Sequence, residues 1–147
     1  MLTQFAFAFA LILLTVVIQG LWLDRVMRRT GAWAKRLITL LPRAGRGMTM
    51  AVVALAALLP HILALLLWTL FYVYVAGAGQ DDALFEPAFY FAATAYTTTG
   101  FGDITMNESW RVLSTLQALG GLLMFAWTAA FLFEVQSRLY RTNKDRA

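Results

Sequence analysis

Three long apolar stretches set the strongest limit on how this chain can fold. They cover residues 5–23, 48–77 and 112–133, and each contains few ionisable side chains. At about 1.5 Å per residue, a helix over any of them can cross the ~30 Å hydrocarbon core of a bilayer. Charged residues make up 14% of the chain, whereas soluble domains contain about 25%. We therefore predict an all-α membrane protein with three transmembrane helices.

The basic residues lie beside these stretches and indicate how the chain is oriented. Eleven of the twelve Lys and Arg residues fall within 24–47 and 138–147. Positive charge stays on the cytoplasmic side of membrane proteins. We therefore expect the N-terminus outside, the C-terminus in the cytoplasm, and no nucleic-acid partner. A cleaved signal peptide would begin with basic residues, and residues 1–4 contain none.

A shorter apolar segment, residues 85–97, lies between the second and third stretches. Pro87 suits the first turn of a helix, because the missing N–H of proline is not needed there. A helix over this segment is ~20 Å long, which is too short to cross a membrane. We expect a re-entrant helix whose C-terminal end, with its partial negative charge, favours a cation near the membrane centre.

The next seven residues, 97–103, read TTTGFGD. Gly100 and Gly102 can take φ > 0 at little cost. When such residues alternate with ordinary ones, successive carbonyls point to one side of the strand. A ring of these strands can replace the water around a dehydrated monovalent cation. The plain alternative is a glycine-rich turn between two helices.

Residues 98–103 resemble the selectivity filter of potassium channels, which usually reads TVGYGD. Phe101 stands in place of Tyr, which occurs within that family, and Thr99 in place of Val adds a hydroxyl. With its additional N-terminal span, the chain resembles small bacterial potassium channels of the two-transmembrane, pore-loop family, located in the bacterial inner membrane. Hydropathy and charge predict an N-terminal transmembrane helix (1–23), a basic cytoplasmic loop (24–47) and a basic tail (135–147). The resemblance covers the part between the loop and the tail and implies a pore domain (48–134). Within the pore domain it implies an outer helix (48–77), a pore helix (85–97), a filter (98–103) and an inner helix (112–134).

The resemblance also implies a role for each filter residue. The carbonyls of Thr98, Thr99, Gly100 and Phe101, with the Thr98 hydroxyl, would form the successive K⁺ sites. Gly102 would shape the outer mouth. K⁺ is then the permeant ion, and we expect no cofactor.

Four further residues are expected to support the filter. Asp103 would brace it from behind, and in relatives a pore-helix tryptophan often holds this aspartate. The matching residue here is Phe91, which cannot donate a hydrogen bond, so Tyr90 is the expected substitute. Thr94 stands where the relative best known for slow filter collapse has a glutamate.

One chain supplies one strand of carbonyls, so the resemblance implies a tetramer, most simply a homotetramer. An isolated filter strand in lipid would leave its carbonyls unsatisfied, at several kcal/mol each. A non-selective cation channel and a non-conducting regulatory subunit are the alternatives. An enzyme is disfavoured, because the chain has one His, no Cys and no acid within a span, which leaves no acid–base or nucleophile–base pair.

Two features within the spans are candidate gating elements. Gly120 and Gly121 permit either close helix packing or a hinge, and the resemblance implies a hinge. His61 follows Pro60, so its imidazole can bond a carbonyl that the proline leaves free. We favour this structural role over a pH sensor, although an intramembrane ionisable residue is a functional candidate by default.

Membrane contacts are expected at both borders. The segment 24–47 carries seven basic residues and one acid, which favours anionic lipid, either non-specifically or at a regulatory site. Residues 33–41 mix apolar and basic residues and suit a helix along the headgroups. On the outer side we expect an aromatic belt of Trp68, Tyr72 and Tyr74. Acidic residues near the outer mouth would attract cations: Asp81, Asp82, Glu86, Asp103 and Glu108.

Overall fold

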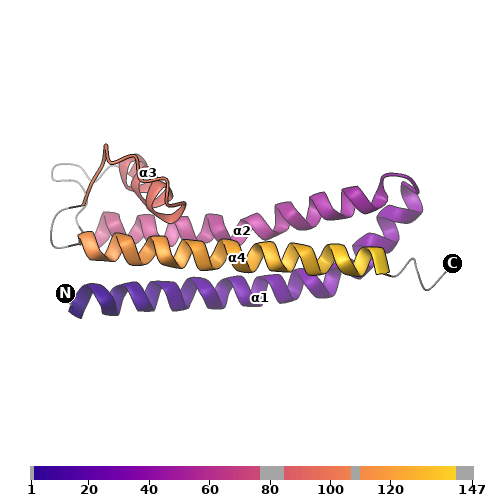
Figure 1. Ribbon diagram of the computed structural model, residues 1–147, viewed down its shortest axis with the longest axis horizontal. Helices are drawn as coiled ribbons and strands as arrows, with labels where there is room; N and C mark the ends of the chain where they lie inside the picture. Colours follow the sequence, from indigo (N-terminus) through magenta and orange to yellow (C-terminus); the bar gives the residue numbers. More distant parts are fainter. Residues whose placement is uncertain (1, 77–84, 107–109, 142–147) are drawn as a thin grey trace.

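The computed structural model describes residues 2–76, 85–106 and 110–141. These ranges contain four helices and no strand, which confirms the all-α prediction. The helices are α1 (Leu2–Leu40), α2 (Gly45–Tyr74), α3 (Phe85–Tyr96) and α4 (Arg111–Arg141). The three long helices run side by side, and the short α3 lies against one end of the bundle (Figure 1).

The long helices have the properties of membrane spans. Each of α1, α2 and α4 is long and apolar enough to cross a bilayer. The short α3 begins at Phe85, as expected, and ends at Tyr96, one residue before the predicted end. The chain is therefore an integral membrane protein with three candidate spans and one shorter helix beside them.

The segment 24–47, expected as a loop, is instead helical as far as Leu40. Buried residues continue at helical spacing from Leu23, just before the first charge, to Val26, Thr30 and Ala34 beyond it. This apolar stripe packs α1 against its neighbours well beyond the apolar stretch. The charges therefore do not mark the end of the helix, and residues 33–40 belong to α1 rather than to a separate amphipathic helix.

The fourth helix also extends further than the sequence suggested, to Arg141 rather than residue 134. Val135 is buried in a cluster that includes Leu23 and Val26 of α1, and Leu139 packs against it. An exposed pair between Arg138 and Glu134, at 2.7 Å, adds local helical support. The first seven residues of the predicted tail are thus part of α4.

The aromatic belt predicted for the end of α2 is wrong at two of its three positions. Trp68 and Tyr72 are buried, and only Tyr74 is exposed, with 79% of its surface accessible. The reason is α3, which returns beside α2: its Phe91 packs edge-on against Tyr72, with ring centroids 5.0 Å apart. These aromatic residues form a core that fixes the short helix to the bundle.

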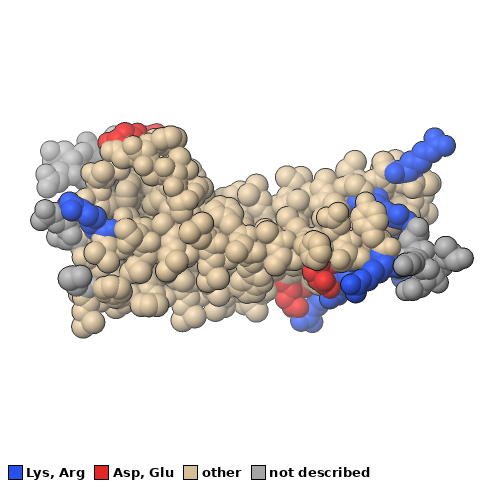
Figure 2. Space-filling model, in the orientation of Figure 1, with Lys and Arg blue, Asp and Glu red and all other residues tan. Residues whose placement is uncertain are grey.

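Charge is distributed unevenly along the bundle. Most Lys and Arg side chains gather toward the end where α1 and α4 finish, with acidic side chains beside them, whereas acidic side chains and a basic group are seen at the α3 end (Figure 2). Glu86 and Asp103 are the described acids at the α3 end, whereas Asp81, Asp82 and Glu108 lie outside the described residues.

Candidate ion-conduction site

The segment after α3 has an alternating backbone. Thr98, Gly100 and Gly102 have φ of 60°, 50° and 82°. Thr99 and Phe101, between them, have no positive φ. Left-handed residues thus alternate with ordinary ones over five positions, the pattern expected to turn successive carbonyls to one side.

The carbonyls of this segment have no partner within the part of the chain that the structure describes. No hydrogen bond from a described residue is accepted by the carbonyls of residues 98–102. All five residues are exposed, Phe101 to 70%. A row of unpaired carbonyl oxygens is a set of ligands suited to a hard, dehydrated cation.

The left-handed conformation of Thr98 was not predicted from the sequence. A β-branched residue at positive φ is a genuine outlier, and the left-handed form costs roughly 1–2 kcal/mol. Such strain persists only where the surroundings enforce it, typically at functional sites. The sequence signal for φ > 0 was glycine, and Thr98 carries no such signal.

Backbone hydrogen bonds to α3 hold the start of the segment in place. The Gly100 amide donates to the Thr94 carbonyl at 3.2 Å, and the Thr98 amide donates to the Ala95 carbonyl at 3.1 Å. The hydroxyls of Thr97 and Thr99 lie 2.9 Å apart. Residues 97–102, which form no β-sheet and are called the strand below, therefore fold back over the last turn of the short helix.

Asp103 is held from the same helix. The Tyr90 hydroxyl donates a hydrogen bond to the Asp103 carboxylate at 2.9 Å. The contact expected from the sequence is present, and its importance for filter stability stays a prediction.

The other two predicted support residues point elsewhere. Phe91 is buried against Tyr72. The Thr94 hydroxyl donates to the Phe91 carbonyl at 3.0 Å, within its own helix. Thr94 therefore supports the strand through its backbone carbonyl, which accepts from Gly100. A cavity of about 330 Å³ lies beside these groups, between the strand and α4.

His61 of α2 contacts both α3 and α4, and so links three helices. Its Nδ1 lies 2.9 Å from the Tyr96 hydroxyl at the end of α3, and its Nε2 lies 2.9 Å from the Thr128 hydroxyl of α4. The ring stacks on Phe125, with centroids 4.7 Å apart. The expected bond to a carbonyl freed by Pro60 is wrong, because hydroxyls occupy both nitrogens. A role in pH sensing stays a prediction.

Gln19 extends this network to α1. Its side-chain amide donates to the Thr128 hydroxyl at 3.1 Å and to the Met124 carbonyl at 3.0 Å. The residue is fully buried, and its Oε1 has no described partner. Gln19 lies within the apolar stretch 5–23 and was not singled out from the sequence. The available signal for this contact was the presence of polar residues at similar depths in different spans.

A second buried polar link ties α2 and α4 to α3. The Tyr72 hydroxyl donates to Gln117 Oε1 at 2.6 Å, and the Gln117 amide donates to the Ala92 carbonyl at 3.0 Å. Both side chains are fully buried. The short helix is thus fixed by polar contacts at its middle and at its C-terminal end.

Gly120 and Gly121 lie where α4 is packed most closely. A Cβ on Gly121 would overlap the Tyr96 carbonyl oxygen, which belongs to the backbone of α3. A Cβ on Gly120 would meet only the Ile12 side chain, at 3.0 Å. The helix runs through both residues without a break. Close packing therefore accounts for the pair, and a gating hinge stays a prediction.

Comparison with known proteins supports the architecture at the level of a family. Curated proteins and solved structures give no match. A family model described as an ion channel matches residues 60–138, which is more than half of the chain. The match includes His61, α3, the alternating strand and most of α4, whereas α1 lies outside it. The chain belongs to this ion channel family.

Proposed function

We propose that the protein is a subunit of a potassium-selective channel, in which residues 98–102 form the filter. The observation that carries the proposal is the alternating backbone of Thr98, Gly100 and Gly102 with unpaired carbonyls. K⁺ passing in single file would bind the carbonyls of residues 98–101, and Gly102 would shape the outer mouth. Carbonyls that replace the hydration shell make such passage possible.

The position of α3 supports this proposal. Its last residue, Tyr96, contacts His61 and Gly121, which lie well inside α2 and α4. The C-terminal end of α3 therefore lies well within the length of these spans, and its partial negative charge favours a cation there. A re-entrant helix followed by a returning strand is the arrangement that a pore loop requires.

The proposed topology follows from the charges. We place the N-terminus and the filter outside and the basic end of the bundle in the cytoplasm, in agreement with the positive-inside rule. The resemblance to bacterial potassium channels favours a bacterial inner membrane. The reaction is passive ion transport rather than catalysis.

Thr99 bears on the choice between a selective and a non-selective pore. Its hydroxyl lies 2.9 Å from the Thr97 hydroxyl of the same chain. The additional hydroxyl is thus satisfied locally and leaves the Thr99 carbonyl as the group available to an ion. This supports a valine-like role for Thr99 and hence K⁺ selectivity over non-selective conduction.

The exposed strand predicts a tetramer, because one chain surrounds an ion on one side only. In mild detergent the purified protein should have a native mass of four chains, about 66 kDa from the 16.4 kDa chain. Gly100→Ala places a side chain at φ 50° and should weaken the assembly, whereas Gly47→Ala, with open space around it, should not. A stable wild-type monomer would contradict the proposal.

A further inference from the structure

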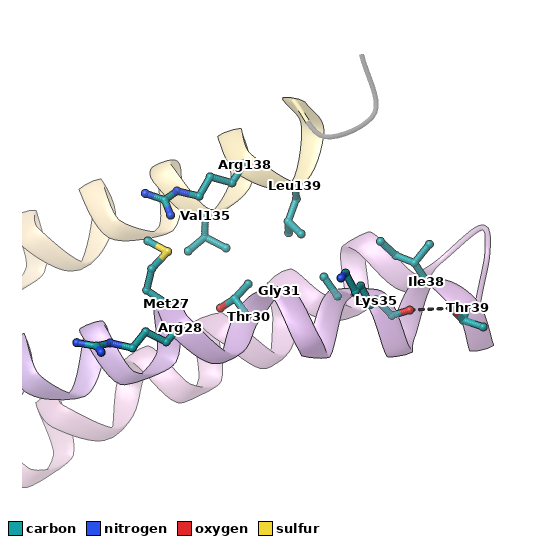
Figure 3. Close-up of a pocket in the computed structure, with 11 residues that line it drawn as sticks. Met27, Arg28, Thr30, Gly31, Lys35, Ile38, Thr39, Val135, Arg138 and Leu139 are labelled. Atoms are coloured by element: carbon teal, nitrogen blue, oxygen red, sulfur yellow. Dashed lines mark hydrogen bonds between the residues drawn. The ribbon is translucent and has the colours of Figure 1, made fainter. Parts of the chain in front are cut away.

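A cavity lies between the final turns of α1 and α4, far from the strand. Its volume is about 700 Å³, within the roughly 300–1,000 Å³ of small-molecule sites. Figure 3 shows the wall: Val135 and Leu139 of α4 face Thr30, Gly31 and Ile38 of α1. Much of the wall is apolar, which suits an occupant with an apolar part.

Three basic side chains line the same cavity. Arg28 and Lys35 come from α1 and Arg138 comes from α4, and none of the lining residues is acidic. In Figure 3 the guanidinium groups of Arg28 and Arg138 lie toward the same end of the opening. Lys35 lies toward the other end, so basic side chains from two helices border the cavity, which favours an anion.

The carboxylates near the cavity pair within their own helices. Arg28 contacts Asp24 at 2.6 Å and Arg138 contacts Glu134 at 2.7 Å. These pairs are exposed, and exposed pairs contribute about 0–1 kcal/mol. Each guanidinium has five donors, so a bound anion can share it with the carboxylate. Lys35 forms no ion pair with a described residue.

The cavity begins just beyond the apolar stretch of α1, where lipid headgroups are expected. The first charged residue of α1 is Asp24, directly after the apolar stretch, and Met27 and Arg28 begin the cavity wall. From the cavity and its charges we infer that it binds an anionic phospholipid. Its phosphate would bind Lys35, with Arg28 and Arg138 toward the other end of the opening, and its glycerol and first methylenes would pack on the apolar wall.

The side chains of residues 142–147 do not match the charge of this site. Residues 142–147 contain Lys144 and Arg146 against one acid, Asp145. Their net positive charge is repelled by a basic wall. An anionic lipid matches both the charge and the apolar surface.

The test is lipid binding by the full-length protein in neutral detergent, measured by native mass spectrometry. The probes are short-chain phosphatidylglycerol and phosphatidylcholine with the same chains. Lys35→Gln should weaken phosphatidylglycerol binding about fivefold, the contribution of one basic residue near an anionic lipid surface. Arg36→Gln is the matched control. It removes the same charge at the next residue, and the Arg36 side chain lies outside the cavity wall.

A second pair of variants tests the cavity without changing charge. A Cβ on Gly31 meets nothing within 4 Å, and Gly31 lines the cavity. Gly31→Leu should fill the space and remove preferential binding, whereas Gly47→Leu, also at an open position, should leave it intact.

Four other results of these experiments would contradict the inference. Equal losses in Lys35→Gln and Arg36→Gln would mean non-specific attraction. Equal binding of both lipids would mean an apolar pocket without anion recognition. Full competition by soluble glycerol phosphate would indicate a soluble anion, and binding to Gly31→Leu would place the lipid elsewhere. None of these readings depends on conduction, so they remain separate from a failure of the channel proposal.

Discussion

Gly121→Ala should destabilise the folded protein by more than about 3 kcal/mol, because its new methyl group overlaps the Tyr96 carbonyl oxygen. Overpacked cores usually lose 1–3 kcal/mol through side-chain shifts. Here the obstacle is backbone, so α3 and α4 must separate. We expect a large fall in the thermal unfolding midpoint in detergent, with loss of the assembled form.

Gly120→Ala is the matched control at the neighbouring position. Its methyl group meets only the Ile12 side chain, at 3.0 Å, which can shift. Alanine also gains about 1 kcal/mol over glycine in a helix interior, so the net change should be small. Equal destabilisation by both substitutions would show that flexibility of the glycine pair, rather than close packing at Gly121, is what the fold requires.

His61→Leu should destabilise the protein by about 2–3 kcal/mol, because it leaves the buried Tyr96 hydroxyl without its partner. Thr128 retains Gln19 as a donor, so most of the loss should arise at Tyr96. The thermal unfolding midpoint of the purified protein measures the effect.

Two conservative variants separate the two hydrogen bonds of the His61 ring, to Tyr96 and to Thr128. Asn places its amide near the Nδ1 position and should retain the Tyr96 contact, whereas Gln places it near Nε2 and should retain the Thr128 contact. His61→Asn should therefore be more stable than His61→Gln. In a double-mutant cycle, Tyr96→Phe should add little to His61→Leu, since their interaction is already lost. Fully additive effects would contradict a direct contact.

Much of the fold was predictable, because a bilayer imposes strict rules on length and polarity. Three apolar stretches gave three long helices, and the apolar segment too short to cross gave α3. The left-handed glycines were predicted at Gly100 and Gly102, where the absence of a Cβ permits φ > 0.

The helix ends were less predictable, because charged residues mark where the apolar stretch ends, whereas packing against a partner helix decides how far the helix continues. Asp24 and Arg25 mark where the apolar stretch ends, yet Val26 and Ala34 keep α1 packed and helical. A pattern of hydropathy locates the membrane border. The buried stripe that continues beyond it becomes visible only when the partner helix is known.

The polar contacts between helices could not be predicted from one sequence. Nothing in the order of residues pairs His61 with Tyr96 and Thr128, which are 35 and 67 positions away. The burial of Trp68 and Tyr72 likewise depends on where α3 returns. Such contacts depend on tertiary arrangement, whereas the strand pattern at 98–103 is local and could be interpreted directly.

The reversal potential of the purified protein in a planar bilayer, with K⁺ on one side and Na⁺ on the other, tests the channel proposal most directly. The proposal predicts reversal near the K⁺ equilibrium potential. Gly100→Ala should abolish this selectivity, because alanine is strained at the φ of 50° found there. A current that reverses near zero would contradict a K⁺-selective filter formed by residues 98–102.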